Sequence, residues 1–215
     1  MPISTVNVLL FNDFELLDAA GPIELLATVP GVDVRTVFLT SEQPAGHDAL
    51  LVRSHQGIEI AASTPLSRPC DLLLVPGGVG TRRLVHQAEA LREISEAAQR
   101  ARVVASVCTG SAILAAAGLL EGYAATSNKM ALSWVRTHGS KVDWIDAARW
   151  VHDRDRWTSS GVSAGMDMTA ALLRKELGDH VHDEVMRFTE YVPERDCAHD
   201  PFAVPTSAGT GGALS

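Results

Sequence analysis

Apolar runs alternate with helical patterns along this chain, and that alternation constrains the fold more than any other feature. The runs VNVLLF (6–11), CDLLLVPGG (70–78) and RVVASV (102–107) are continuous and rich in strand-forming residues. Such runs are typical of strands that are covered on both faces, as in parallel sheets. Because helical segments lie between them, the order predicts an α/β fold of three layers, with a mostly parallel central sheet and helices on both faces.

The other segments fit the same order. A strand is expected at 32–40, a hairpin at 49–60, a short strand at 123–127 and two strands around a charged turn at 153–155 within 141–161. Helices are expected at 14–29, where Pro22 would begin a second piece, and at 81–101, 109–120, 129–138, 163–177 and 179–190. Ser163 is the expected N-cap of the helix at 163–177. No repeat or linker interrupts this order, so we expect one domain over 1–205 and a flexible tail over 206–215.

Composition excludes several classes of protein. The formal net charge is −8 and no cluster of Lys and Arg forms a basic face, so we expect no nucleic-acid partner. No apolar run reaches the roughly 18 residues that a membrane span needs, and the first residues do not resemble a signal peptide. The three cysteines are too scattered for a disulfide framework or a CxxC metal site, which favours a cytoplasmic protein with no metal and no cofactor.

One cysteine stands where a strand turns into a helix. In ASVCTGSAILAAAGLLEG (105–122), Cys108 ends an apolar run and a helix of small residues follows at once. A nucleophile elbow needs small flanking residues, which Ser106, Gly110 and Ser111 supply. The helix N-terminus is expected to lower the pKa of the thiol. The alternative is that Cys108 is a small buried hydrophobe, as most free cysteines are.

Two further features are expected at the same edge of the sheet, because the carboxyl ends of parallel strands meet there. Asp18 follows the first strand, and Gly77 and Gly78 end the run DLLLVPGG. Backbone N–H groups at Gly78 and Thr109 are candidates for an oxyanion hole. Asp18 on its own is also compatible with a helix-capping or surface carboxylate.

Other chemistry-bearing patterns are weaker. His182–Glu184 matches a His-x-Glu pair but lies in a predicted helix, where residues two apart face different ways, and the spacing of His180 and His182 is wrong for a shared metal. GVGTRR (78–83) lacks the Gly-Lys-Ser/Thr ending of a phosphate-binding loop. A cysteine α/β-hydrolase would need a late loop histidine, for which His199 qualifies, but would leave Asp18 without a role. Asp167 either faces the site or complements its helix N-terminus.

The chain resembles the DJ-1/PfpI superfamily from about Val6 to Phe202. The resemblance lies in LLFNDFELLDAAGPIELL, DLLLVPGG, VVASVCTGSAILAAAGLLEGYAAT and TSSGVSAGMDMTAALL, above all in D-x-x-G-P together with V-C-T-G-S. The chain is most similar to the isocyanide hydratase branch and to the amidase-like sensor domains of AraC-type regulators. The fold of this superfamily is related to that of class I glutamine amidotransferases. The resemblance implies a flavodoxin-like fold, a homodimer, Asp18 as the acid, Cys108 as the nucleophile, and Gly78 and Thr109 as oxyanion-hole amides.

One departure from the family pattern concerns the segment ATSNKMALSW (125–134). Asn128 stands where the protease and regulator branches have a histidine, and an amide cannot move a proton near pH 7. The resemblance implies hydration of an isocyanide, a reaction that does not depend on that histidine. Asn128, Gly77 and Trp150 are expected to line the substrate pocket. The alternatives are an amidase or glyoxalase of the same family, and a non-enzymatic sensor in which Cys108 is oxidised or a ligand is bound.

Overall fold

A computed structural model describes residues 2–42 and 50–203 of the chain. Within them a seven-stranded sheet forms the middle layer, in the order β10, β11, β7, β6, β1, β2, β5. All neighbouring pairs in this sheet are parallel except β10 with β11. In that order, the strands are β10 (Trp150–Asp153), β11 (Arg156–Ser159), β7 (Val103–Ser106), β6 (Leu72–Val75), β1 (Thr5–Leu9), β2 (Asp33–Phe38) and β5 (Thr64–Pro65). The predicted α/β class, with a mostly parallel sheet, is confirmed.

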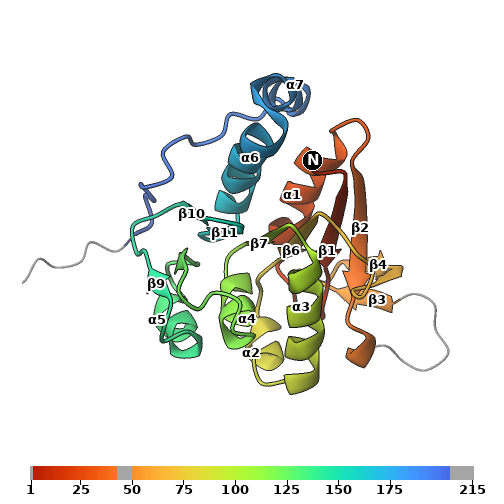
Figure 1. Cartoon of the computed structure of the whole chain (residues 1–215), viewed down its shortest axis with the longest axis vertical. Helices are drawn as coiled ribbons and strands as arrows, with labels where there is room; N and C mark the ends of the chain where they lie inside the picture. Colours follow the sequence, from red (N-terminus) through yellow and green to blue (C-terminus); the bar gives the residue numbers. More distant parts are fainter. Residues whose placement is uncertain (1, 43–49, 204–215) are drawn as a thin grey trace, which may run out of the picture.

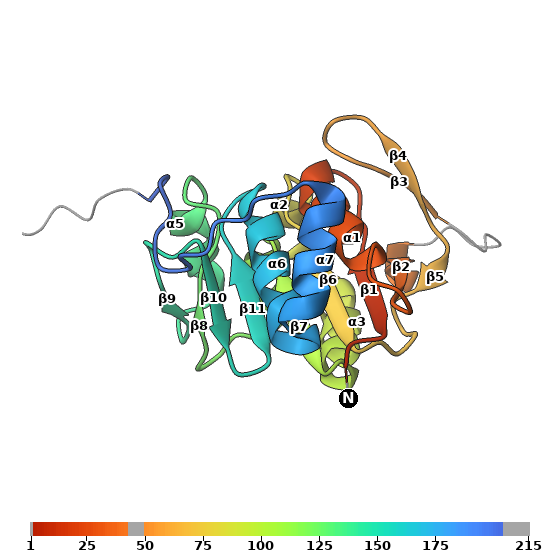
Figure 2. The ribbon, with the colours of Figure 1, turned by 90° about the horizontal axis from the view of Figure 1, so that it is seen from above.

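Helices cover both faces of this sheet (Figures 1 and 2). On one face, α6 packs against both α1 and α7, and on the other α4 packs against α2 and α3. These helices are α1 (Leu16–Ala27), α2 (Thr81–Leu84), α3 (Ala88–Arg100), α4 (Gly110–Ala116), α6 (Ala164–Leu177) and α7 (Asp179–Thr189). The core lies between the layers, where the residues of β1, β6 and β7 are almost all fully buried.

Smaller elements lie beside the sheet. The hairpin β3–β4 and the parallel pair β8–β9 form separate two-stranded sheets. The segment expected to be helical at 129–138 forms only a short helix followed by a 3₁₀ turn. These elements are β3 (Leu50–Arg53), β4 (Glu59–Ala62), β8 (Ala124–Ala125), β9 (Asp143–Trp144), α5 (Leu132–Val135), η1 (Thr40–Glu42) and η2 (Arg136–His138). The predicted hairpin and the two strands around the turn at 153–155 are confirmed.

Three further helix predictions need correction. The helix expected at 81–101 is two helices, because a tight turn at 85–87 brings both Leu84 and Val85 into the core. Pro22 lies inside the single helix α1, where burial of the helix face offsets the hydrogen bond that proline cannot donate. The helix expected at 109–120 ends at Ala116, and Gly118 follows with a positive φ of 74°, a conformation that glycine adopts at helix ends.

The C-terminal segment leaves α7 and runs back across the molecule towards β10 and α5 (Figures 1 and 2). Backbone hydrogen bonds attach it there: Arg149 N–H donates to the carbonyl of Cys197, and Asp200 N–H donates to the carbonyl of Ala147. The expected tail at 206–215 lies outside the described residues. No helix among the described residues combines the length and apolar character needed to cross a membrane.

Candidate active site

The carboxyl ends of four adjacent strands meet at one edge of the sheet. Cys108 follows β7, Gly77 and Gly78 follow β6, and the turn before α1 follows β1. The residues 160–163 that follow β11 reach the same edge, because β11 pairs in parallel with β7. The structure therefore brings together the residues that the sequence places after separate strands.

Cys108 lies at a sharp turn between β7 and α4. Its φ is +57°, a left-handed conformation that non-glycine residues rarely adopt and that costs energy, and its thiol is buried. Its N–H donates to the carbonyl of Ser160 at 3.2 Å. Its carbonyl accepts hydrogen bonds from the hydroxyls of Ser127 at 2.8 Å and Ser111 at 3.1 Å. The backbone of the elbow is thus fixed on both sides.

Asp18 lies in the first turn of α1 and is fully buried. Its Oδ2 accepts a hydrogen bond from the N–H of Gly77 at 2.9 Å. Burial, with a smaller contribution from the charge of Glu15, raises the pKa of Asp18 to about 7, although the Gly77 N–H and the neighbouring Cys108 thiol act against the rise. Both forms of the carboxyl are therefore populated near neutral pH.

The thiol of Cys108 differs from the expectation. Burial, and then the charge of Asp18, raise its pKa to about 12, although the N–H and hydroxyl of Thr109 and the N–H of Val162 act in the opposite direction. The predicted lowering by the helix N-terminus is outweighed because the sulfur is buried and faces a carboxyl group. The resting site therefore holds a protonated thiol next to an ionisable carboxyl.

Of the two backbone amides expected to form an oxyanion hole, that of Gly78 has a protein acceptor, whereas that of Thr109 favours the charged form of the Cys108 sulfur. Gly78 N–H donates to the hydroxyl of Thr109 at 3.0 Å, and Gly77 N–H donates to Asp18. A Cβ at Gly77 would lie 2.6 Å from the nitrogen of Thr109 and 2.9 Å from Oδ2 of Asp18. Only glycine allows this close approach of the two turns. An oxyanion at Gly78 would have to displace the Thr109 hydroxyl.

The hairpin β3–β4 supports the beginning of α1. Gln56, in the turn of the hairpin, accepts a hydrogen bond from Leu16 N–H at 3.0 Å and donates to Glu15 at 2.6 Å. Gln56 thus caps a helix whose own N-cap residue makes no side-chain cap. It also holds near Asp18 the Glu15 carboxylate that raises the pKa of Asp18.

A cavity of about 400 Å³ lies next to residues that contact the elbow, although Cys108 itself is not among its lining residues. Two of its lining residues contact the elbow: the carbonyl of Ser160 accepts the N–H of Cys108, and the N–H of Val162 lies within hydrogen-bonding reach of both Cys108 and Asp18. Val162 has a φ of +48°, which is strained for a β-branched residue. The cavity is lined by Asn128, Lys129, Met130, Ser160, Gly161, Val162, Ser163 and Phe202.

The predicted pocket residues lie in different places. Asn128 lines this cavity, with its amide against Gly161. Gly77 lies at the Asp18 carboxyl rather than among the lining residues. Trp150 is buried in β10 and lines a separate cavity of about 90 Å³. Sequence reasoning missed Ser160 and Val162, although both lie in the quoted segment TSSGVSAGMDMTAALL.

The rival sites lie elsewhere. His182 is buried within α7 against Asp183 and Arg174, and Asp167 accepts hydrogen bonds from Arg149, Tyr191 and Glu194, which gives it a structural role. Ser163 begins α6 as predicted, but its hydroxyl accepts from Arg149 and makes no cap. Within the described residues no cluster of three or more His, Cys, Asp or Glu could hold a metal ion.

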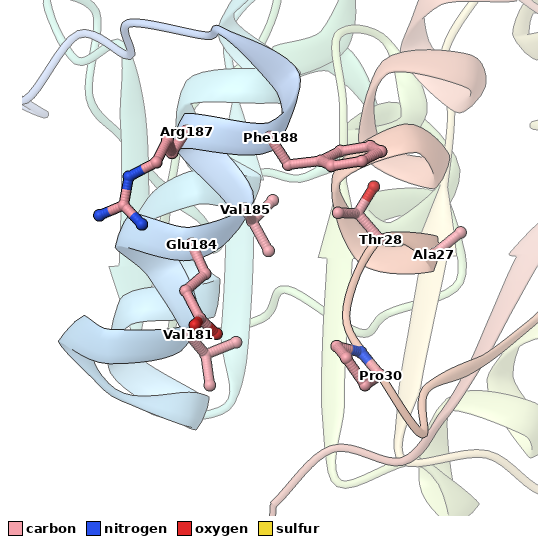
Figure 3. Close-up of a pocket in the computed structure, with 8 residues that line it drawn as sticks. All are labelled: Ala27, Thr28, Pro30, Val181, Glu184, Val185, Arg187 and Phe188. Carbon is pink, nitrogen blue, oxygen red and sulfur yellow. The ribbon is translucent and has the colours of Figure 1, made fainter.

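A larger groove of about 620 Å³ runs between the end of α1 and α7 (Figure 3). It contains neither a cysteine nor a buried carboxyl, and its charged groups are the exposed Glu184 and Arg187. We therefore place the candidate site at the smaller cavity beside Cys108. The groove is lined by Ala27, Thr28, Pro30, Val181, Glu184, Val185, Arg187 and Phe188.

The fold and the elbow define the class: a flavodoxin-like α/β protein with a cysteine at the turn from a central parallel strand into a helix. Within that class, the chain belongs to the DJ-1/PfpI family, whose model matches residues 4–175.

Comparisons with individual proteins agree with this assignment. The chain is 34% identical to an isonitrile hydratase of Pseudomonas putida, over 87% of this chain and 78% of that protein. It is 31% identical to the HTH-type transcriptional regulator GbdR of Pseudomonas aeruginosa, over 81% of this chain but only 47% of the regulator. A ThiJ/PfpI family protein from Pseudomonas syringae superposes with a TM-score of 0.74 at 28% identity, covering 98% of this chain and 80% of that one. Drosophila melanogaster DJ-1beta shares the fold, with a TM-score of 0.72 at 19% identity over 88% of this chain and 99% of its own.

Proposed function

We propose that the chain is a cysteine-dependent enzyme that adds water to an isocyanide and releases an N-substituted formamide. The observation that carries the proposal is the pairing of a buried carboxyl, Asp18, whose pKa is about 7, with the thiol of Cys108 at the elbow and beside a cavity. The likeness to an isonitrile hydratase, over most of both chains, supports this reaction among those of the family.

In the first half of the reaction, the thiol adds across the isocyanide carbon. Ionised Asp18 accepts the thiol proton as the sulfur attacks, so that the nucleophile forms only in contact with substrate. Protonated Asp18 then donates this proton to the former isocyanide carbon. An S–C bond and a C–H bond form, one C–N π bond is lost, and the product is a thioimidate on Cys108.

In the second half, water releases the product. Asp18, again ionised, takes a proton from water as the oxygen adds to the thioimidate carbon, and it passes this proton to the nitrogen. The S–C bond then breaks as Asp18 takes the proton of the new hydroxyl group, the formamide leaves, and Asp18 returns this proton to the sulfur. The N–H groups of Thr109 and Val162 and the Thr109 hydroxyl stabilise the departing thiolate, because all three favour the charged form of Cys108.

A second candidate function is a ligand or redox sensor. The match to about half of the regulator GbdR favours this alternative, because the matched region is there one part of a longer transcriptional regulator. In a sensor, a ligand would bind or peroxide would oxidise Cys108, and no substrate would be turned over. The homodimer and the cytoplasmic location inferred from the sequence stay predictions.

Turnover of an aryl isocyanide to its formamide tests the proposal. We expect steady formamide production by the unaltered protein, a fall to background in Cys108→Ala, and a loss of at least about 100-fold in Asp18→Ala, the range for removal of a general acid–base. Asp153→Asn, at a turn remote from the elbow, serves as the control and should retain activity. Folded, reduced protein that makes no formamide above background would exclude the hydratase and favour the sensor.

A further inference from the structure

We infer that the cavity beside Cys108 binds the apolar substituent of an uncharged substrate, and that Met130 and Phe202 at its rim select aryl or branched alkyl substituents over small ones. This inference rests on the proposed function in one respect, namely that the reacting carbon of the substrate is held at Cys108. The position, charge and rim of the cavity support it separately.

The cavity is separated from the reacting sulfur by its own lining residues, because Cys108 does not line it but two lining residues contact Cys108. Ser160 accepts a hydrogen bond from the backbone of Cys108, and Val162 approaches both Cys108 and Asp18. Both residues line the cavity. In the proposed binding mode, a molecule whose reactive carbon reaches the thiol extends its other end past Ser160 and Val162 into this space. A volume of about 400 Å³ lies at the lower end of the range for small-molecule pockets.

The charges around the cavity cancel. Lys129, the one charged residue that lines it, forms a 3.8 Å ion pair with Asp200 and donates to the hydroxyl of Thr126 and the carbonyl of Ala148. Behind it, Arg149 pairs with Asp167 at 2.6 Å and with Asp200 at 3.7 Å. Two cations thus face two carboxylates, and all four side chains are at most 10% exposed. The cavity therefore offers no uncompensated charge to a ligand, and burial would penalise a charged substituent.

The rim of the cavity is apolar and exposed. Met130 is 98% exposed and Phe202 71% exposed, which is unusual for large hydrophobic side chains that flank one opening. They come from distant parts of the chain, and Phe202 belongs to the C-terminal segment. Contact with an apolar substituent would remove part of this surface from water, and a larger substituent would cover more of it.

Phe202 is positioned by the ionic cluster. Asp200 anchors the segment through its N–H, which donates to the carbonyl of Ala147 at 2.8 Å. The Oδ1 of Asp200 accepts the N–H of Phe202 at 3.0 Å. The rim residue is therefore fixed relative to the cavity before any ligand binds, which reduces the entropy lost on binding.

Kinetics on two isocyanides tests the inference. We expect Phe202→Ala and Met130→Ala each to raise KM for an aryl isocyanide about tenfold, with KM for methyl isocyanide changed less than about twofold and kcat little altered for both. Val192→Ala is the matched control, because Val192 is 90% exposed on the same segment and does not line the cavity. Equal changes for both substrates, or none for either, would overturn the inference.

Alkylation provides a readout that does not need isocyanide turnover. Iodoacetamide and N-benzyl iodoacetamide both form an S–CH₂ bond at Cys108, release iodide and lose the thiol proton to solvent. For each reagent we measure the alkylation rate at the Cys108 peptide and at free cysteine. We expect the rate with the benzyl reagent divided by the rate with iodoacetamide to be at least fivefold higher at Cys108 than at free cysteine. Phe202→Ala should remove this preference. A preserved benzyl preference in a protein without hydratase activity would uphold the pocket and reject only the reaction; no preference in the unaltered protein would reject the pocket.

Discussion

At the scale of single residues, the site is a pair of groups whose protonation states depend on each other. The Asp18 carboxylate is the second cause, after burial, of the high pKa of Cys108, and burial is the first cause of the high pKa of Asp18. The charge of one group therefore depends on the other, because the elbow and the first turn of α1 bring them together. In the proposed reaction, Cys108 is the nucleophile and Asp18 accepts its proton.

Replacing Asp18 should separate thiol reactivity from turnover. Asp18→Asn removes the negative charge beside Cys108, so the pKa of the thiol falls and alkylation by iodoacetamide at pH 9 should become about 3–10-fold faster. Formamide production should nevertheless fall at least about 100-fold, because the amide cannot carry a proton. Alkylation that slows in parallel with turnover would contradict this assignment of roles. Rates at the Cys108 peptide, measured by mass spectrometry, distinguish the two results.

The same substitution should change how stability depends on pH. The pKa of Asp18 is about 7 in the folded protein against 3.8 for the free side chain, so the unfolded chain releases this proton at lower pH than the folded one. The contribution of Asp18 to stability is therefore present below about pH 4 and is lost as the pH rises to about 7, by up to about 4 kcal/mol.

Urea unfolding at pH 5 and pH 8 checks this effect. We expect Asp18→Asn to gain stability relative to the unaltered protein between pH 5 and pH 8, because the neutral amide has no buried charge to form. A stability difference between the two proteins that is constant across this range would show that Asp18 does not titrate there.

Only those parts of the site that follow from the order of residues along the chain could be predicted from sequence. Cys108, Asp18 and the glycine pair follow strands in a recognisable order, so their meeting at one edge could be inferred. The contribution of Val162 could not, because it depends on a left-handed backbone that a valine gives no reason to expect. The pKa of Cys108 was predicted in the wrong direction, since burial depends on tertiary packing.

At the scale of elements, the elbow depends on close packing of α6 against Val107, the residue between β7 and Cys108. A Cβ at Gly165, in the first turn of α6, would lie 2.6 Å from a methyl group of Val107, the residue before Cys108. We expect Gly165→Ala to lower the free energy of unfolding by about 1–2 kcal/mol, because overpacking outweighs the helix propensity gained.

Lys175→Ala, an exposed position on the same helix, is the control and should have little effect. The midpoint of urea unfolding, at constant m-value, measures both variants. A midpoint that rises in Gly165→Ala would mean that α6 and Val107 are less tightly packed than this contact indicates.

Helix boundaries show the limit of pattern reasoning for elements. The repeat from Leu84 to Ala98 is compatible with one long helix, yet the chain turns at 85–87, and α2 and α3 pack against α4 as two separate helices. Amphipathic spacing records which residues are buried and not which neighbour buries them. The strands were predicted better, because their continuous apolar runs require cover on both faces.

At the scale of the whole molecule, one buried arginine connects three distant parts of the chain. Arg149, just before β10, contacts Asp167 in α6, and it contacts Cys197 and Asp200 in the C-terminal segment. Removal of Arg149 would leave the buried carboxylate of Asp167 without its cation, whereas Asp200 would keep Lys129. Arg149→Met should therefore destabilise the fold by about 3 kcal/mol.

A double-mutant cycle in urea provides the control for this prediction. The loss in Arg149→Met with Asp167→Asn should be clearly smaller than the sum of the two single losses, because the uncompensated charge is then absent. Strictly additive losses would mean that the two side chains do not interact. The sequence could not predict this connection, because it joins residues whose spacing follows no local pattern.

Rapid quenching with peptide mass analysis can reveal whether Cys108 forms a covalent bond to the isocyanide carbon. During turnover of an aryl isocyanide, we expect the peptide containing Cys108 to gain the full mass of the isocyanide, and the peptides containing Cys70 and Cys197 to gain none. The adduct should disappear when substrate is exhausted. Formamide production without any adduct on Cys108, or undiminished production by Cys108→Ala, would show that Cys108 is not the nucleophile.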